Sequence, residues 1–313
     1  MGVPEVTVYP ARLVRTMDPS RPTGEAVAVI GDRIRAVGSM AEMEQYPGIR
    51  IDDRYRDQVL FPGFVEAHTH PFGGLLWNFP YVGYYQAMSP DGRVWEGCKS
   101  ITAVVDRLRE AQATLAPGEA LFAWGLDPIF FPGERLDKRH LDSVSAERPI
   151  VIQHVSGHML TVNSAVLKGD NITRDTPVEG VAKGPDGEPN GELQEPAAMS
   201  LVVSAPSLNQ MASVFNAAGM MNFGLDARNH GATTVCDLGN PWLGDPSMVD
   251  AFRQQVDSDE FPARINAFLM AGGFATYGSD PAQTAQFALS LREASSEKLR
   301  FGHIQLVLDG SIQ

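Results

Sequence analysis

Two histidines that stand two positions apart, His68 and His70, are the residues best placed to do chemistry, because they end an apolar run. Successive side chains of a strand point to opposite faces, so residues two apart point the same way. Two neutral imidazoles that converge at the end of a strand are a natural pair of ligands for Zn²⁺ and similar divalent ions. A bare His-x-His is common, so this interpretation depends on the elements that surround the pair.

The element that must position this pair is a buried strand predicted to begin at Val59-Leu60-Phe61 and to lead into the two histidines. The residues before it, 5–58, read as a small antiparallel sheet with a hairpin at Gly31-Asp32, a dipeptide that favours tight turns. Its predicted strands are 6–9, 12–15, 26–30 and 33–37.

The rest of the chain predicts helices and strands in alternation. Residues 101–115 form one clear helix, with Ser100 as its N-cap, and 120–124 and 149–154 are apolar runs that read as strands. Later helices at 208–230, 246–257 and 281–295 lead into strands at 232–237, 264–269 and 303–309. This alternation indicates an α/β fold with a parallel sheet covered by helices, and it fits a barrel or an open sheet equally.

The predicted domain organisation is a small β-rich part at 1–58 and an α/β part at 59–313, with a long insertion at about 72–205. A (β/α)8 barrel needs eight strands and typically ~250 residues, with its active site at the C-terminal mouth. Only about four core strands can be placed. We therefore expect the sequence to be the N-terminal portion of a longer chain.

Composition and charge exclude several classes of protein. The net charge of −13 would repel a phosphate backbone, which argues against a nucleic-acid partner. No apolar run is long enough to span a membrane, and the first residues have no secretory signal. The two cysteines, Cys98 and Cys236, form no CxxC motif and fit a reduced, cytoplasmic protein.

The run Phe61–His70 closely resembles the first-strand signature of the amidohydrolase superfamily, and residues 28–38 resemble the sheet that precedes it there. Further runs are similar to amidohydrolase family 3, in the branch of the N-substituted formamide deformylase-like enzymes. These runs are Trp124–Asp127, Arg135–Asp137, Ser156–Ser164, Gly187–Glu195, Gly231–Asp237 and Asp309–Ser311. The resemblance extends from about residue 25 to the end of the sequence.

This resemblance implies a TIM-like barrel beside a small β-sandwich, and hydrolysis of a non-peptide C–N bond in a small amide-type substrate. It implies one or two divalent metals, usually zinc, whose bound water has a pKa lowered to about 7. The catalytic base and two further histidine ligands are expected beyond residue 313. The related strand often carries a lysine, which can be carboxylated to bridge two metals, where this chain has Gln305. Gln305 therefore puts the second metal in doubt.

Three further residues are candidates for substrate binding: His158, Trp124 and Asp127. His158 could polarise the substrate or be an ordinary loop histidine, while Trp124 and Asp127 could line the pocket or serve as packing and a turn cap. Glu192 and Glu195 could reach the metal or be solvated loop carboxylates, and the Gly/Pro-rich segment around them favours the second interpretation. Two strand-end carboxylates lie at the functional end of a barrel: Asp237 and Asp309.

Two functions remain open. The first is a metal-dependent amidohydrolase, and the second is a catalytically inactive relative that acts as a binding or regulatory protein. The intact pair His68 and His70 favours the first function, whereas Gln305 favours the second. An aromatic loop at 77–85 could form an apolar wall, which would favour a hydrophobic N-acyl or N-formyl amide as the substrate, or it could be a packed surface loop. A homo-oligomer is also open.

Overall fold

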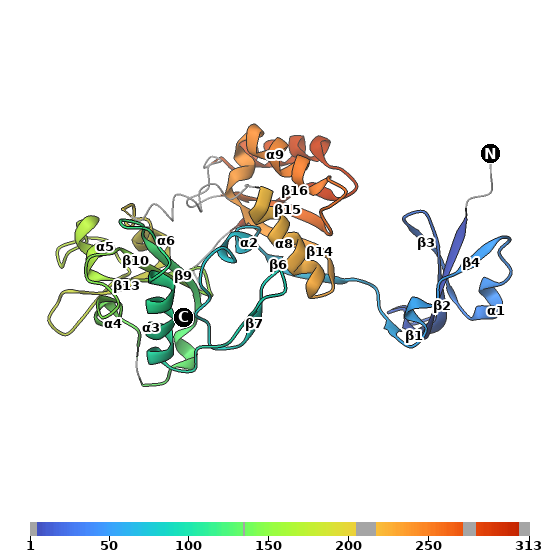
Figure 1. The fold of residues 1–313 in the computed structure, drawn as a ribbon. Helices are drawn as coiled ribbons and strands as arrows, with labels where there is room; N and C mark the ends of the chain where they lie inside the picture. Colours follow the sequence, from blue (N-terminus) through green and yellow to red (C-terminus); the bar gives the residue numbers. More distant parts are fainter. Residues whose placement is uncertain (1–4, 134, 205–216, 272–279, 307–313) are drawn as a thin grey trace. The chain divides into compact units, whose positions relative to one another are not determined.

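The computed structural model describes residues 5–133, 135–204, 217–271 and 280–306. The chain divides into two compact units, Met1–Phe64 and Val65–Gln313, which we describe separately (Figure 1). In the described residues no helix combines the length and the apolar character that crossing a bilayer requires.

The first unit is a five-stranded sheet in the order β3-β2-β1-β4, with β5 paired to β1. Its elements are β1 (Val6–Arg15), β2 (Thr23–Ile30), β3 (Arg33–Gly38), α1 (Met40–Met43), β4 (Ile49–Ile51), η1 (Asp53–Tyr55) and β5 (Val59–Leu60). The predicted hairpin is confirmed, and Gly31 supplies its positive φ of 58°. The strands predicted at 6–9 and 12–15 are one strand, since the register shifts between Pro10 and Val14 without ending the pairing.

The predicted insertion contains a second sheet, in the order β12-β13-β11-β10-β9, in which only β9 and β10 are parallel. Its strands are β9 (Leu121–Leu126), β10 (Ile150–His154), β11 (Met159–Val162), β12 (Val181–Lys183) and β13 (Pro189–Gln194). Its helices are α3 (Ile101–Gln112), η2 (Pro128–Phe130), α4 (Lys138–Asp142), α5 (Ser164–Gly169) and α6 (Glu195–Met199). As predicted, Ser100 caps α3 by accepting a hydrogen bond from the Ala103 N–H.

Asn163 ties this sheet to its helices and is fully buried. Its Oδ1 accepts hydrogen bonds from the backbone N–H groups of Ile150 and Val166, at 3.1 and 3.2 Å. Its Nδ2 donates to the carbonyl oxygens of Ser145 and Arg148, both at 2.8 Å. One amide side chain therefore satisfies four backbone groups at the turn from β11 into α5, through two buried and two partly buried hydrogen bonds.

The third sheet has the order β16-β15-β14-β6, and β14, β15 and β16 are parallel. Its strands are β6 (Phe64–Thr69), β14 (Ala232–Asn240), β15 (Arg264–Ala271) and β16 (Leu299–Leu306). The other elements are α2 (Gly73–Leu76), β7 (Ala87–Met88), β8 (Val94–Trp95), α8 (Ala217–Asn229), η3 (Pro241–Gly244), α9 (Pro246–Val256), α10 (Pro281–Leu291) and η4 (Arg292–Ala294). The predicted alternation of helices and parallel strands is confirmed here, and the start of the predicted helix 208–230 lies outside the described residues.

The described strands form open sheets and no closed barrel, and the expected incomplete barrel stays a prediction. One expectation needs correction. The strand predicted as buried from Val59 is broken at Phe61-Pro62-Gly63 into β5 and β6, and the side chains of Phe64 and Val65 are exposed. The physical reasons are that proline cannot donate to a strand ladder and that β6 is the edge strand of its sheet.

Helices α2 and α8 approach each other closely at Gly74. A Cβ atom at this position would overlap the backbone of Gly219 and Phe223 on α8. The Nδ2 of Asn222 also donates to the Gly74 carbonyl at 3.3 Å. A residue without a side chain therefore lets α2, which follows the two histidines directly, lie against the helix that leads into β14.

Candidate functional site

The two histidines lie next to each other at the end of β6. Their ring centroids are 5.3 Å apart and the rings are nearly perpendicular. His68 is exposed, while His70 is only partly so and stacks on Phe72, with 5.4 Å between centroids. The local spacing thus brings two imidazoles together as the alternation of a strand requires.

Asp237, on the neighbouring strand β14, brings a carboxylate to the same place. Its Oδ1 lies 3.4 Å from His70 Nδ1, and its Oδ2 accepts a hydrogen bond from Asn240 Nδ2 at 2.7 Å. The residue is 1% exposed, and burial raises its pKa while the hydrogen bonds from His70 and Asn240 oppose the rise. A carboxylate that accepts the Nδ1–H of an imidazole leaves Nε2 free to bind a ligand.

A bulge in β14 makes this arrangement possible. The register with β15 shifts between Asp237 and Asn240, and Gly239 in the bulge has a φ of 81°. A Cβ atom at Gly239 would overlap the Oε1 atom of Gln305, which lies on β16. That Oε1 atom is buried and has no hydrogen-bond partner among the described residues.

The described residues include no cluster of three His, Cys, Asp or Glu side chains that could hold a metal ion. What they provide is a pair of imidazoles, one of them oriented by a buried carboxylate. Imidazole nitrogens are donors that Zn²⁺ and similar divalent ions prefer, so the residue types present are compatible with such an ion. Asp309, the other predicted strand-end carboxylate, lies outside the described residues.

Trp124 and Asp127 lie at the end of β9. Trp124 packs edge-on against Trp77 and Tyr81, with ring centroids 4.8 and 5.0 Å away, and its buried Nε1 has no partner among the described residues. Asp127 caps η2 by accepting a hydrogen bond from the Ile129 N–H at 3.1 Å. Asp127 therefore has a structural task, whereas Trp124 belongs to an aromatic cluster.

His158 lies in the turn between β10 and β11, and its Nδ1 is 2.9 Å from Glu195 Oε2. Glu195 was expected to be a solvated loop carboxylate, but it begins α6 and is only partly exposed. This pairing was missed in the sequence, because the two residues are 37 positions apart.

Glu192 was also expected to be solvated, and this expectation is wrong. The residue is 5% exposed on β13, and Arg135 binds it through Nε and Nη2, at 2.6 and 3.1 Å. The bidentate guanidinium compensates the carboxylate charge. Both faces of β13 are covered at this point, because the neighbouring Leu193 is buried as well, and a Gly/Pro-rich sequence does not reveal this.

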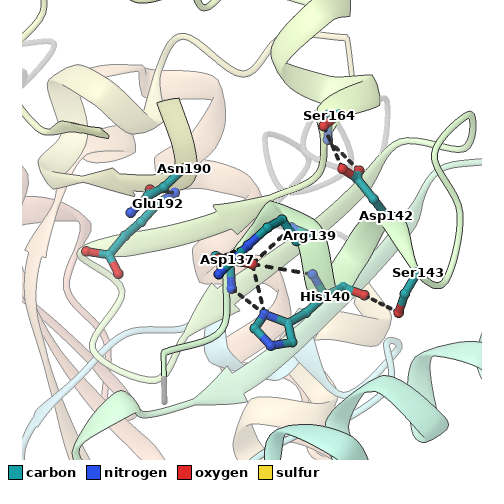
Figure 2. Close-up of polar contacts among 8 residues, drawn as sticks. All are labelled: Asp137, Arg139, His140, Asp142, Ser143, Ser164, Asn190 and Glu192. Carbon is teal, nitrogen blue, oxygen red and sulfur yellow. Dashed lines mark hydrogen bonds and ion pairs between the residues drawn. The ribbon is translucent and has the colours of Figure 1, made fainter. Parts of the chain in front are cut away.

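The run Arg135–Asp137 also has a structural role. Figure 2 shows the Asp137 carboxylate at the start of α4, where Oδ1 accepts from the Arg139 N–H at 3.0 Å and lies 2.9 Å from His140 Nδ1. In the same helix Asp142 accepts a 2.7 Å hydrogen bond from Ser164 Oγ. Asp137 and His140 form the capping box of α4, and the hydrogen bond between Asp142 and Ser164 joins α4 to α5.

One cavity of the second unit does not contain the histidine pair. Its volume is about 660 Å³, and its lining includes Trp77, Phe79, Trp95 and Arg107. The aromatic loop at 77–85 therefore contributes to a hollow on the α3 side of β9, as well as to the cluster around Trp124.

Most of the chain matches a known protein family. Residues 56–313 match the family described as “Amidohydrolase family”. The chain is similar to the protein LONG AFTER FAR-RED 3 of Arabidopsis thaliana, with 29% identity over 73% of this chain and 37% of that protein. It is also similar to the exoenzymes regulatory protein AepA of Pectobacterium carotovorum, with 22% identity over 98% of this chain and 64% of AepA.

A solved structure has a similar fold. It is an uncharacterized metal-dependent hydrolase from Pyrococcus horikoshii, with a TM-score of 0.57 and 14% identity over 98% of this chain and 55% of that one. The chain thus spans between about a third and two thirds of the length of these proteins.

Proposed function

We propose, because the chain belongs to the amidohydrolase family, that it forms part of a metal-dependent hydrolase that cleaves an amide-type C–N bond in a small molecule. The observation that carries this proposal is the pair His68 and His70 at a strand end, with Asp237 buried behind His70. The formamide deformylase-like branch is part of the same proposal and rests on the sequence runs alone.

His68 and His70 are the residues that would hold the metal. Asp237 accepts the Nδ1–H of His70, so that the Nε2 atom of His70 is the one available for coordination. A bound divalent ion, which we propose to be zinc, supplies a water of lowered pKa and polarises the substrate carbonyl. We propose a single ion, because the amide of Gln305 is neutral and cannot be carboxylated.

The substrate would lie against residues of the predicted insertion. We propose that His158 contacts the substrate and that Trp124 forms part of an apolar wall with Trp77 and Tyr81. Asp127 would support that wall through the turn that it caps. An aromatic wall favours a hydrophobic N-acyl or N-formyl amide.

The organisation proposed from the sequence remains a small β part at 1–58, one layer of a sandwich, and a barrel part at 59–313. The parallel strands β14, β15 and β16 and the edge strand β6 would be four of the barrel's strands. We retain a cytoplasmic location and an open oligomeric state as parts of this proposal. The two free cysteines, Cys98 and Cys236, fit a reducing compartment.

Metal analysis of the full-length protein tests the proposal. We expect close to one equivalent of zinc, iron or manganese after supplementation, and almost none in His68→Ala/His70→Ala. The variant His230→Ala, which removes an imidazole that is 66% exposed, is the matched control and should keep the metal. Equal metal content in the double variant and the control would refute the assignment.

Activity is tested on N-acetyl, N-formyl and N-benzoyl derivatives of benzylamine, with release of the free amine as the readout. We expect hydrolysis of at least one amide by the wild type and none by the double variant.

The second candidate function is a binding or regulatory protein without catalysis. Two observations favour it, Gln305 in place of a lysine and the similarity to a protein named as regulatory. A folded full-length protein that takes up less than a few tenths of an equivalent of metal after supplementation would favour this function over the hydrolase.

A further inference from the structure

Two runs that the sequence singled out separately, Ser156–Ser164 and Gly187–Glu195, meet at the end of an antiparallel ladder. Strands β11 and β13 pair with Met159 opposite Gln194. One step beyond that pair, the Glu195 N–H donates to the His158 carbonyl oxygen at 2.8 Å. The side chains pair too, since His158 Nδ1 and Glu195 Oε2 are 2.9 Å apart. Glu195 is therefore fixed to His158 by backbone and side chain together.

The backbone of Glu195 adopts a conformation that L-residues avoid. Its φ is +62°, in the left-handed region where glycine is the usual residue. Asn171 and Met17 are the other non-glycine residues with positive φ in the described part of the chain. A strained backbone conformation costs free energy, and such conformations cluster at functional sites. The strain at Glu195 therefore indicates that its side chain has a function. The strain at Glu195 aims its carboxylate back at the imidazole.

This pair lies close to the histidine strand. Gly157, the residue before His158, has a φ of +75°, and a Cβ placed on it would be 4.0 Å from Phe72 Cζ. Phe72 stacks on His70 with 12° between the ring planes. One aromatic side chain thus separates the turn that carries His158 from the imidazole proposed as a metal ligand.

We propose that Glu195 is a positioning residue, which holds the His158 imidazole with Nδ1 protonated so that Nε2 accepts a hydrogen bond from the N–H of an amide substrate. This inference rests on the proposed hydrolase function and adds to it a requirement for an N–H group on the substrate. The ionised carboxylate can only accept hydrogen bonds, so pairing with it selects the tautomer that carries the proton on Nδ1. Nε2 of His158 has no protein partner among the described residues.

The tautomer of His158 is the direct readout, and the chemical shifts of the ring nitrogens in ¹⁵N-histidine-labelled full-length protein distinguish the two forms. We expect the Nδ1–H form to predominate in the wild type and the Nε2–H form in Glu195→Ala. Glu188→Ala is the matched control, because the Glu188 side chain is 40% exposed and that of Glu195 is 41% exposed. The control should leave the tautomer of His158 unchanged.

Glu195→Gly keeps the test decisive if the alanine variant folds poorly. Glycine removes the carboxylate and also relieves the backbone at this position, so the variant should fold at least as well as the wild type. A purely structural role for Glu195 would leave the tautomer of His158 unchanged in this variant. That result would overturn the proposal.

The contact with substrate is tested by titrating the labelled wild type with N-benzylacetamide, which carries one N–H. A change in the His158 Nε2 chemical shift that is absent with N-benzyl-N-methylacetamide, which lacks the N–H, supports the proposal. Equal changes with both amides, or none with either, overturn it. Neither readout needs turnover, so a failure of every amide to be hydrolysed would count against the proposed function and leave the tautomer result standing.

Discussion

The buried imidazole of His154 makes the stability of the protein depend on pH. The residue is 3% exposed in β10, its Nε2 lies 2.8 Å from Thr161 Oγ1, and its Nδ1 has no partner among the described residues. Burial lowers the pKa of His154 from 6.5 to about 4, and the Glu192 carboxylate opposes the change. The folded chain therefore binds a proton here much less readily than the unfolded chain does.

The direction in which stability changes with pH follows from this difference in pKa between the folded and the unfolded chain. Above pH 6.5 neither state carries the proton, so His154 imposes no cost, whereas between 6.5 and about 4 only the unfolded chain is protonated. The free energy of unfolding should then fall as the pH falls through this window. At about 1.4 kcal/mol per pH unit, the loss reaches about 3 kcal/mol near the lower end.

Urea unfolding measured between about pH 4 and pH 7 tests this calculation. The double variant His154→Leu/Thr161→Val replaces both partners with apolar side chains and should lose this part of the pH dependence. The matched control, Thr161→Val, keeps the buried imidazole and should keep the pH dependence even though it is less stable. If the double variant and the control fall in stability equally toward low pH, the reasoning is refuted.

Three further predictions concern packing and capping, and urea unfolding tests each of them. Gly74→Ala should cost about 1–3 kcal/mol or more, because its Cβ would overlap Gly219, whereas Gly73→Ala, which meets nothing within 4 Å, should be neutral or slightly stabilising. Equal effects of these two would contradict the close helix approach. Ser100→Ala should cost about 1 kcal/mol through the lost cap of α3, and Ser100→Thr should restore most of it. Asn163→Ala should cost about 3–5 kcal/mol, because it leaves two buried and two partly buried backbone groups without their side-chain partner, and a loss below about 1 kcal/mol would show that they find others.

The features that could be predicted from the sequence are local. The spacing of His68 and His70 is a property of one strand, and the cap at Ser100 needs only the residues that follow it. The alternation of helices with β14, β15 and β16 also follows from short apolar runs. Patterns of this kind depend only on residues that are close together in the sequence.

The features that could not be predicted depend on which strands pair and in which register. Glu195 reaches His158 because β11 and β13 are neighbours, and Glu192 is buried on a strand that lies between β11 and β12 and is covered on both faces. The pairing of Asp237 with His70 depends on the adjacency of β14 and β6 and on a bulge at Gly239. Periodicity predicts which residues are in strands, but it does not specify the partner strand.

The distance along the chain between His70 and Asp237, 167 positions, has a consequence for synthesis on the ribosome. The hairpin of β10 and β11 joins neighbouring segments and can close soon after they emerge, whereas His70 must wait for β14. We expect nascent chains arrested before residue 232 to protect the β9–β13 sheet from a protease while the end of β6 stays open to cleavage. Protection of β6 in such arrested chains would show that translation of β14 is not the step that completes the histidine site.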